Sequence, residues 1–186
     1  MSADSVLFVG GVRSGKSALA QRWAEARAAR RLYVATARVD DATMAARIAR
    51  HRAERGAGWQ CLEAPLAPVD ALRARCDGPE AERPGVVLFD CVSLWIANML
   101  ACDMAEDAVL ERVATLASLA AAPGLPLALV SLEAGLGMVP LSAVGRSYQD
   151  ALGLANQMLA RACGTVLHVA CGLPLPLKGR LPEELC

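Results

Sequence analysis

The chain has 186 residues, 55% of them apolar and 20% charged, a composition that can build a packed core and excludes the disordered class. Basic and acidic residues balance at 19 each, which argues against nucleic acid as a partner. The most apolar region, 113–144, is interrupted by Pro123, Pro126 and Glu133, and the first residues lack a signal-peptide pattern. We therefore expect a single domain over residues 1–186, in the cytoplasm and without stable membrane insertion.

Short apolar runs alternate along the chain with longer amphipathic stretches, which is typical of an α/β fold with a mostly parallel sheet flanked by helices. The strands are expected at residues 6–9, 32–35, 86–90, 127–131 and 165–170. The helices are expected at residues 17–30, 42–55, 92–101, 105–121 and 148–163. The less regular region 57–84 has a possible edge strand at 59–62 and a short helix at 69–75. The proline-rich tail 172–186 is expected to cross the surface.

Seven cysteines are scattered without any C-x-x-C pair, so the sequence indicates neither a zinc site nor a disulfide framework. Most of them have apolar neighbours, so we expect buried thiols, which suit a reducing compartment.

A phosphate-binding loop is the clearest motif in the chain. Its glycines are expected to let the backbone curl around a phosphate, while the helix that follows adds free N–H groups. Lys16 would meet the β- and γ-phosphates of a nucleotide, and the hydroxyl of Ser17 would bind Mg²⁺. The pattern G-x-x-x-x-G-K-[ST] is matched in full by Gly10, Gly11, Val12, Arg13, Ser14, Gly15, Lys16 and Ser17.

A carboxylate from a neighbouring strand should also serve the metal. Asp90 ends the apolar run 86–90 and is the best candidate, although it could simply cap the next helix. Glu133 lies just beyond the run 127–131, at the edge where open α/β sheets place their ligands.

A basic helical face surrounds one of the two histidines. Arg47, His51 and Arg55 recur every four residues, so they lie on one side of the predicted helix 42–55. This face could be a solvated surface, or the positive field could keep the imidazole neutral and nucleophilic beside a triphosphate. His168 lies within a predicted strand and is expected to be a core or edge residue.

These features together resemble the bifunctional adenosylcobinamide kinase / adenosylcobinamide-phosphate guanylyltransferases of cobalamin biosynthesis. The resemblance runs from Val6 to about Lys178. It is carried by residues 10–17, 33–37, 47–52, 63–65, 90–95 with Asn98, Glu133 with the glycines after it, and 146–150 with Asn156 and Gln157.

The resemblance implies a P-loop fold of the recombinase type and two reactions. The first phosphorylates the hydroxyl of adenosylcobinamide with ATP or GTP. The second transfers GMP from GTP to that phosphate, by way of a guanylylated histidine that corresponds to His51. It also implies that the chain forms a homo-oligomer, a trimer. From the motif and the strand ends themselves, we expect Lys16 and Glu133 to take part in catalysis together with Mg²⁺. The positions that resemble the family's GTP contacts, besides the loop 10–17, are Ala35, Thr36, Ala37, Arg52, Ala53, Glu54, Arg55, Glu63 and Asp90.

Some alternatives stay open from the residues. Glu133 and Asp90 are both candidates for the general base, and a positioned γ-phosphate needs neither. The family usually has Asn and Val where this chain has Leu132 and Ala134. A P-loop kinase of another small alcohol would leave His51 structural. A strand-exchange-like ATPase would need a basic, aromatic-rich groove, which the composition does not favour.

Overall fold

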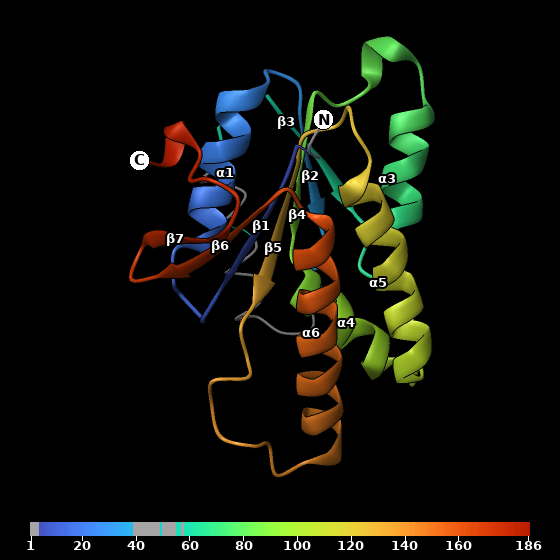
Figure 1. The fold of residues 1–186 in the computed structure, drawn as a ribbon. Coiled ribbons are helices and arrows are strands. Elements are labelled where there is room, and N and C mark those ends of the chain that lie inside the picture. The colour runs from blue at the N-terminus through green and yellow to red at the C-terminus, as the bar shows by residue number, and fades with distance from the viewer. Residues whose placement is uncertain (1–3, 39–48, 50–54, 57) are drawn as a thin grey trace.

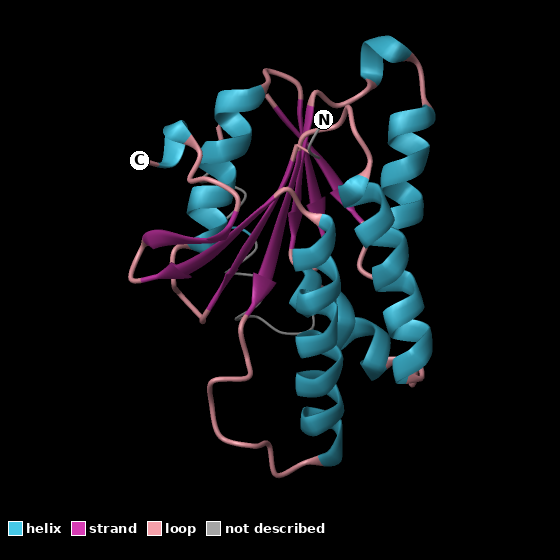
Figure 2. Ribbon diagram, viewed as in Figure 1, coloured by secondary structure: helices cyan, strands magenta, loops and turns pink. Residues whose placement is uncertain are grey.

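The computed structural model describes residues 4–38, 49, 55–56 and 58–186. Figure 1 shows a twisted sheet between two layers of helices. Helix α1 and the C-terminal tail lie on one face, and α3, α4, α5 and α6 cover the other, as the secondary-structure colouring makes clear (Figure 2). The predicted α/β class is confirmed.

The described residues form one seven-stranded sheet in the order β3-β2-β4-β5-β1-β6-β7. The first six strands of this order run parallel and β7 is antiparallel to β6. The strands are β1 Ser5–Gly10, β2 Arg31–Ala35, β3 Trp59–Glu63, β4 Val86–Asp90, β5 Leu127–Leu132, β6 Thr165–Ala170 and β7 Leu173–Lys178.

The helices follow the predicted pattern with shifted ends. The largest shift is at α6, which begins five residues before the predicted start because Ser142 caps it, its hydroxyl accepting from the Gly145 N–H at 3.1 Å. The α-helices are α1 Lys16–Arg27, α3 Pro68–Asp77, α4 Val92–Ala101, α5 Glu106–Ala121 and α6 Ala143–Ala162. The predicted helix 42–55 lies almost entirely outside the described residues. Among those described, no helix combines the length and the apolar character needed to cross a bilayer.

Each sheet face has its own apolar core. The α1 face buries Phe8, Trp23 and Leu88, and the opposite face buries Phe89, Trp95 and Leu116. This two-sided burial explains why β1, β4 and β5 read as nearly continuous apolar runs.

The C-terminal tail differs from its prediction. Residues 173–178 form the edge strand β7, and Leu185 is buried against the α1 face. Two prolines are tolerated in β7 because an edge strand has one side without ladder hydrogen bonds.

The expectation that most cysteines are buried is wrong. Cys91 and Cys163 are buried and Cys76 is partly covered, but Cys61, Cys102, Cys171 and Cys186 are exposed. Apolar neighbours in the sequence did not predict burial of these cysteines, because several of the cysteines lie at the ends of elements or on edge strands.

Candidate active site

The phosphate loop joins the end of β1 to the start of α1, as predicted. Gly15 is in the left-handed region with φ of 96° and precedes Lys16, the first residue of the helix. The Lys16 ammonium donates to the Gly11 carbonyl at 2.9 Å, so it lies over the loop. The loop therefore has the free helix N-terminus and the lysine that a phosphate site needs.

Both framing glycines are required by packing against the end of β6. A Cβ at Gly10 would lie 2.3 Å from the Val169 carbonyl oxygen, and one at Gly15 would lie 3.0 Å from the Gly172 Cα. The Gly172 N–H also donates to the Ser14 carbonyl at 2.8 Å. The loop therefore packs directly against the β6–β7 turn. The two glycines are needed for this packing as well as for the predicted access of a phosphate.

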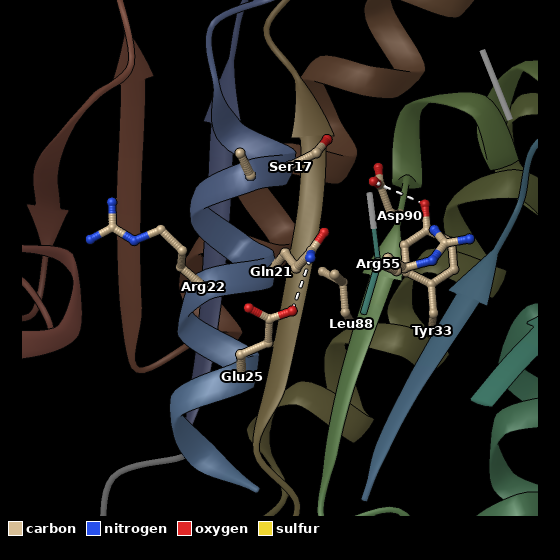
Figure 3. A pocket seen from close by; sticks show the side chains of 9 residues that line it. Ser17, Gln21, Arg22, Glu25, Tyr33, Arg55, Leu88 and Asp90 are labelled. Carbon is tan, nitrogen blue, oxygen red and sulfur yellow. Dashed lines mark hydrogen bonds between the residues drawn. The ribbon is translucent and has the colours of Figure 1, made fainter. Parts of the chain in front are cut away.

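A pocket of about 330 Å³ opens beside this loop, between α1 and strands β2 and β4 (Figure 3). Ser17 lies at the helix end of the pocket and Asp90 at the carboxyl end of β4. The fold thus brings the two predicted metal ligands to one cavity. The lining residues are Ser17, Ala18, Gln21, Arg22, Glu25, Tyr33, Arg55, Leu88 and Asp90.

The strand that carries Asp90 is not the neighbour of β1 that we expected. β5 lies between β1 and β4, and the parallel register still brings Gly10, Leu132 and Asp90 to the same sheet edge. The physical reason is that every parallel strand ends at this edge, so the functional carboxylate can follow a more distant strand.

The donors at this pocket suit magnesium held together with a nucleotide. A hydroxyl and a carboxylate are oxygen ligands of the kind Mg²⁺ prefers, and Mg²⁺ commonly takes its remaining ligands from phosphates and water. Within the described part of the chain, no group of three His, Cys, Asp or Glu side chains could hold a metal ion by itself. The residues present therefore fit a metal that arrives with its substrate.

The turn after Asp90 is held by the side-chain hydroxyl of Thr36, the residue that directly follows β2. The Thr36 hydroxyl donates to the Cys91 carbonyl at 2.8 Å and accepts from the Cys91 N–H at 2.9 Å. The Asn98 amide donates to the Thr36 and Pro65 carbonyls at 2.7 and 3.0 Å. Thr36, a predicted nucleotide contact, is fully buried, and its observed bonds hold this turn. Its flanking residues Ala35 and Ala37 are partly exposed at the same edge.

Six of the nine lining residues had no role predicted from the sequence, and Tyr33 and Glu25 among them make side-chain hydrogen bonds within the site. The Tyr33 hydroxyl donates to Asp90 Oδ2 at 3.1 Å, and the Arg55 guanidinium lies 3.6 Å from the centroid of the Tyr33 ring. Glu25 accepts from Gln21 at 2.9 Å and from the Trp59 indole at 3.2 Å. The helical spacing of Ser17, Gln21 and Glu25 could have indicated a shared face of α1.

Glu133 and Glu63 lie at the same sheet edge but outside the lining of this pocket. The Glu133 N–H donates to the Gly10 carbonyl at 3.1 Å, and its carboxylate accepts from the Gly135 N–H at 2.7 Å. Glu63 ends β3 opposite Ala35 and is exposed. His51, Arg52, Ala53 and Glu54 lie outside the described residues.

The segment after Glu133 is held in place by side chains of α6. Gln149 donates to the Ala134 carbonyl at 2.9 Å, and Asn156 donates to the Leu132 carbonyl at 3.0 Å. Arg146 donates to the Pro140 and Leu141 carbonyls at 3.1 and 2.8 Å. These contacts give a structural role to several residues of the resemblance that have no evident part in phosphate binding.

Comparison with known proteins agrees with this geometry. The sequence model of one family, described as cobinamide kinase / cobinamide phosphate guanyltransferase, matches residues 6–177. The chain belongs to this family. The resemblance noted from the sequence is therefore confirmed over nearly the whole length.

Curated relatives of the family align over almost their entire length. The chain is 45% identical to the bifunctional adenosylcobalamin biosynthesis protein CobP of Pseudomonas aeruginosa, over 93% of this chain and 96% of that protein. It is 31% identical to the bifunctional adenosylcobalamin biosynthesis protein CobU of Escherichia coli, over 93% and 99%. The chain thus aligns with nearly the full length of relatives that are named as bifunctional.

Solved structures support the fold at lower identity. A KaiC-like protein of Pyrococcus horikoshii superposes with a TM-score of 0.54 at 15% identity, covering 98% of this chain and 82% of that one. An ATPase from a bacterial type III secretion system superposes with a TM-score of 0.52 at 11% identity, covering 99% and 60%. The expected P-loop NTPase fold is confirmed, and nothing about substrates follows from these two likenesses.

Proposed function

We propose that this enzyme phosphorylates the hydroxyl of adenosylcobinamide with ATP or GTP, and then transfers GMP from GTP to the new phosphate with release of pyrophosphate. Family membership supports the pair of reactions. The observation that carries the proposal is that Ser17, the last residue of the phosphate loop, and Asp90 line one pocket.

In the phosphorylation step, the chain's contribution is positioning and charge stabilisation. The N–H groups of the phosphate loop and the Lys16 ammonium would surround the β- and γ-phosphates, where charge develops as the phosphoryl group leaves. Mg²⁺ held by Ser17 and Asp90 would supply further positive charge to the phosphates. Glu133 is tied to the phosphate loop, because its N–H donates to the Gly10 carbonyl. Its carboxylate is a candidate to orient the acceptor hydroxyl.

In the transfer step, His51 is the proposed nucleophile. A neutral imidazole nitrogen attacks the α-phosphorus of GTP, and the bond to pyrophosphate breaks as the P–N bond forms. A phosphate oxygen of the acceptor then attacks the same phosphorus, which releases the imidazole and forms the new pyrophosphate linkage. This route avoids direct attack of one phosphate anion on the triphosphate. Arg52 and Arg55 are proposed to contact the nucleotide, and so are Ala35, Thr36, Ala37 and Glu63.

A cytoplasmic location and assembly as a homo-oligomer, a trimer, are further parts of the proposal. The cytoplasm supplies both triphosphates. Assembly would cover part of an exposed apolar surface, and several large apolar side chains are more than 70% exposed in this protein. They are Leu136, Met138, Val139, Leu141 and Leu173.

The decisive test is a search for the covalent intermediate. Purified protein is incubated with Mg²⁺ and GTP labelled at the α-phosphate, then denatured at alkaline pH and separated by electrophoresis. We expect label on the wild type that alkali preserves and that acid or hydroxylamine removes, as for a P–N bond.

A matched pair of variants completes this test. His51→Ala should lose the label, whereas His168→Ala should keep it, because His168 is half-buried within β6 and is the only other histidine. Absence of label on folded wild type that binds GTP would contradict the guanylyl transfer and leave a kinase.

A further inference from the structure

The carboxylate of Asp90 has a hydrogen-bond donor that no motif of the phosphate loop requires. The Tyr33 hydroxyl donates to its Oδ2 at 3.1 Å from the adjacent strand, where Ala35 pairs with Asp90 and Tyr33 with Leu88 (Figure 3). The terminal torsion of an aspartate has a broad energy profile, so the carboxylate plane is set by its hydrogen bonds. The hydrogen bond from Tyr33 engages Oδ2 and thereby fixes the direction in which the other oxygen, Oδ1, points.

The surroundings of Tyr33 keep this bond rigid and shielded. The ring is 9% exposed and packs edge-on against Trp59, with centroids 6.3 Å apart and planes at 81°. The Arg55 guanidinium covers the ring at 3.6 Å from its centroid. Trp59 is itself held by its indole bond to Glu25. A phenol packed against both Trp59 and Arg55 cannot swing away from Asp90 without repacking these neighbours.

The backbone at Asp90 does not depend on Tyr33. Thr36 bonds both the N–H and the carbonyl of Cys91, and Asn98 anchors Thr36 in turn. Loss of the Tyr33 hydroxyl should therefore release the carboxylate while the turn keeps its place.

We propose that Tyr33 is a positioning residue that orients the Asp90 carboxylate for the Mg²⁺ that accompanies the nucleotide. Partners that hydrogen-bond to a metal ligand orient it, and their loss weakens metal binding about tenfold or more. The inference rests on the proposed function only through magnesium–nucleotide binding at the phosphate loop. It does not depend on guanylylation of His51.

The test compares two variants that each remove one phenolic hydroxyl. Tyr33→Phe keeps the ring, the Trp59 contact and the Arg55 stack. Tyr148→Phe is the matched control, because Tyr148 is the only other tyrosine and its hydroxyl bonds Ser93. Binding of an α,β-methylene analogue of GTP, which cannot transfer GMP, is measured by calorimetry in excess Mg²⁺ and in excess EDTA.

We expect Tyr33→Phe to bind the analogue about tenfold more weakly in Mg²⁺, to need more Mg²⁺ for half-maximal binding, and to match the wild type in EDTA. Tyr148→Phe should match the wild type in both conditions. An unchanged Mg²⁺ dependence of Tyr33→Phe, or an equal loss of affinity in Mg²⁺ and EDTA, would overturn the proposal.

A second background separates positioning from a general loss of stability. The double variant Asp90→Asn/Tyr33→Phe should have the same Mg²⁺ dependence as the single variant Asp90→Asn, because both lack the carboxylate that Tyr33 orients. A further tenfold loss in that background would assign the effect of Tyr33 to something other than Asp90. Wild type that bound no analogue in either condition would overturn the proposed function as well, which distinguishes the two failures.

Discussion

Gly10 and Gly11 are adjacent in the same motif and meet different surroundings. A Cβ added at Gly10 would overlap the Val169 carbonyl oxygen at 2.3 Å and approach the Ser14 hydroxyl at 2.8 Å. A Cβ at Gly11 would have no heavy atom of the described chain within 4 Å. Only the first position is therefore restricted to glycine by the packing of the loop on β6.

This contrast predicts different stabilities for two matched variants. Gly10→Ala should lower the free energy of unfolding by about 1–3 kcal/mol, because backbone must shift to admit the methyl group. Gly11→Ala should change it by less than about 0.5 kcal/mol. Urea unfolding of both proteins without nucleotide measures this, and equal losses for the two variants would refute the packing argument.

At the scale of an element, α6 is fixed at both ends by side chains. Ser142 caps its first turn, and the Lys178 ammonium from β7 reaches its C-terminal carbonyls. The acceptors are Ala160, Arg161 and Cys163, at 3.0, 2.9 and 2.6 Å. A cation at this end also complements the helix dipole. One of the only two lysines in the chain thus ties the edge strand to the helix that holds the Glu133 segment.

Removal of this cap should loosen the end of α6. Lys178→Met keeps an unbranched side chain and should lower the free energy of unfolding by about 1 kcal/mol, since three carbonyls lose a charged donor. The control Arg180→Met removes one positive charge from an exposed residue nearby. Thermal unfolding of both variants is the measurement, and no difference between them would mean that the cap does not stabilise the helix.

For the whole molecule, the buried thiols make stability sensitive to alkaline pH. Burial raises the pKa of Cys91 and of Cys163 to about 11 from an ordinary value of 9.0. Between these two values the unfolded chain releases protons that the folded chain retains. The folded state therefore binds more protons, and its stability must fall as pH rises through this range.

We expect the free energy of unfolding to decline between pH 9 and about 11 and to change little from these groups below that range. Denaturant unfolding at pH 8, 9, 10 and 11 tests this. Cys163→Ala should show a shallower decline, whatever stability it loses at pH 8. Cys186→Ala, at the exposed C-terminus, should decline as the wild type does. Parallel pH curves for all three proteins would count against the buried-thiol explanation.

Much of the fold could be read from local patterns. Strand β4 and helix α4 coincide with their predicted ranges, because a doubly buried strand is a continuous apolar run and Cys91 begins the helix directly after it. Strand β7 was missed because two prolines among three leucines do not read as a strand. The early start of α6 was missed because serine and glycine are common in loops, and the capping bond between Ser142 and Gly145 is evident only in the structure.

The candidate site was predictable where chemistry needs fixed spacing along the chain. The phosphate loop, with Lys16 and Ser17, is such a segment, since consecutive N–H groups must converge on one phosphate. Asp90 was predictable as the end of a strand, but the position of that strand in the sheet was not. Tyr33 was not assigned, because its hydrogen bond joins residues 57 positions apart and depends on the β2–β4 register.

The sequence by itself determined the family, the phosphate loop and the alternation of strands and helices, because each depends on residues close together in the chain or on several motifs in a fixed order. Tertiary structure alone decided that β5 separates β1 from β4, that the loop rests on the β6–β7 turn, and that Tyr33, Arg55 and Asp90 line one pocket. These relations arise from strand order and register, and pairing between distant segments leaves no periodic signal within either segment.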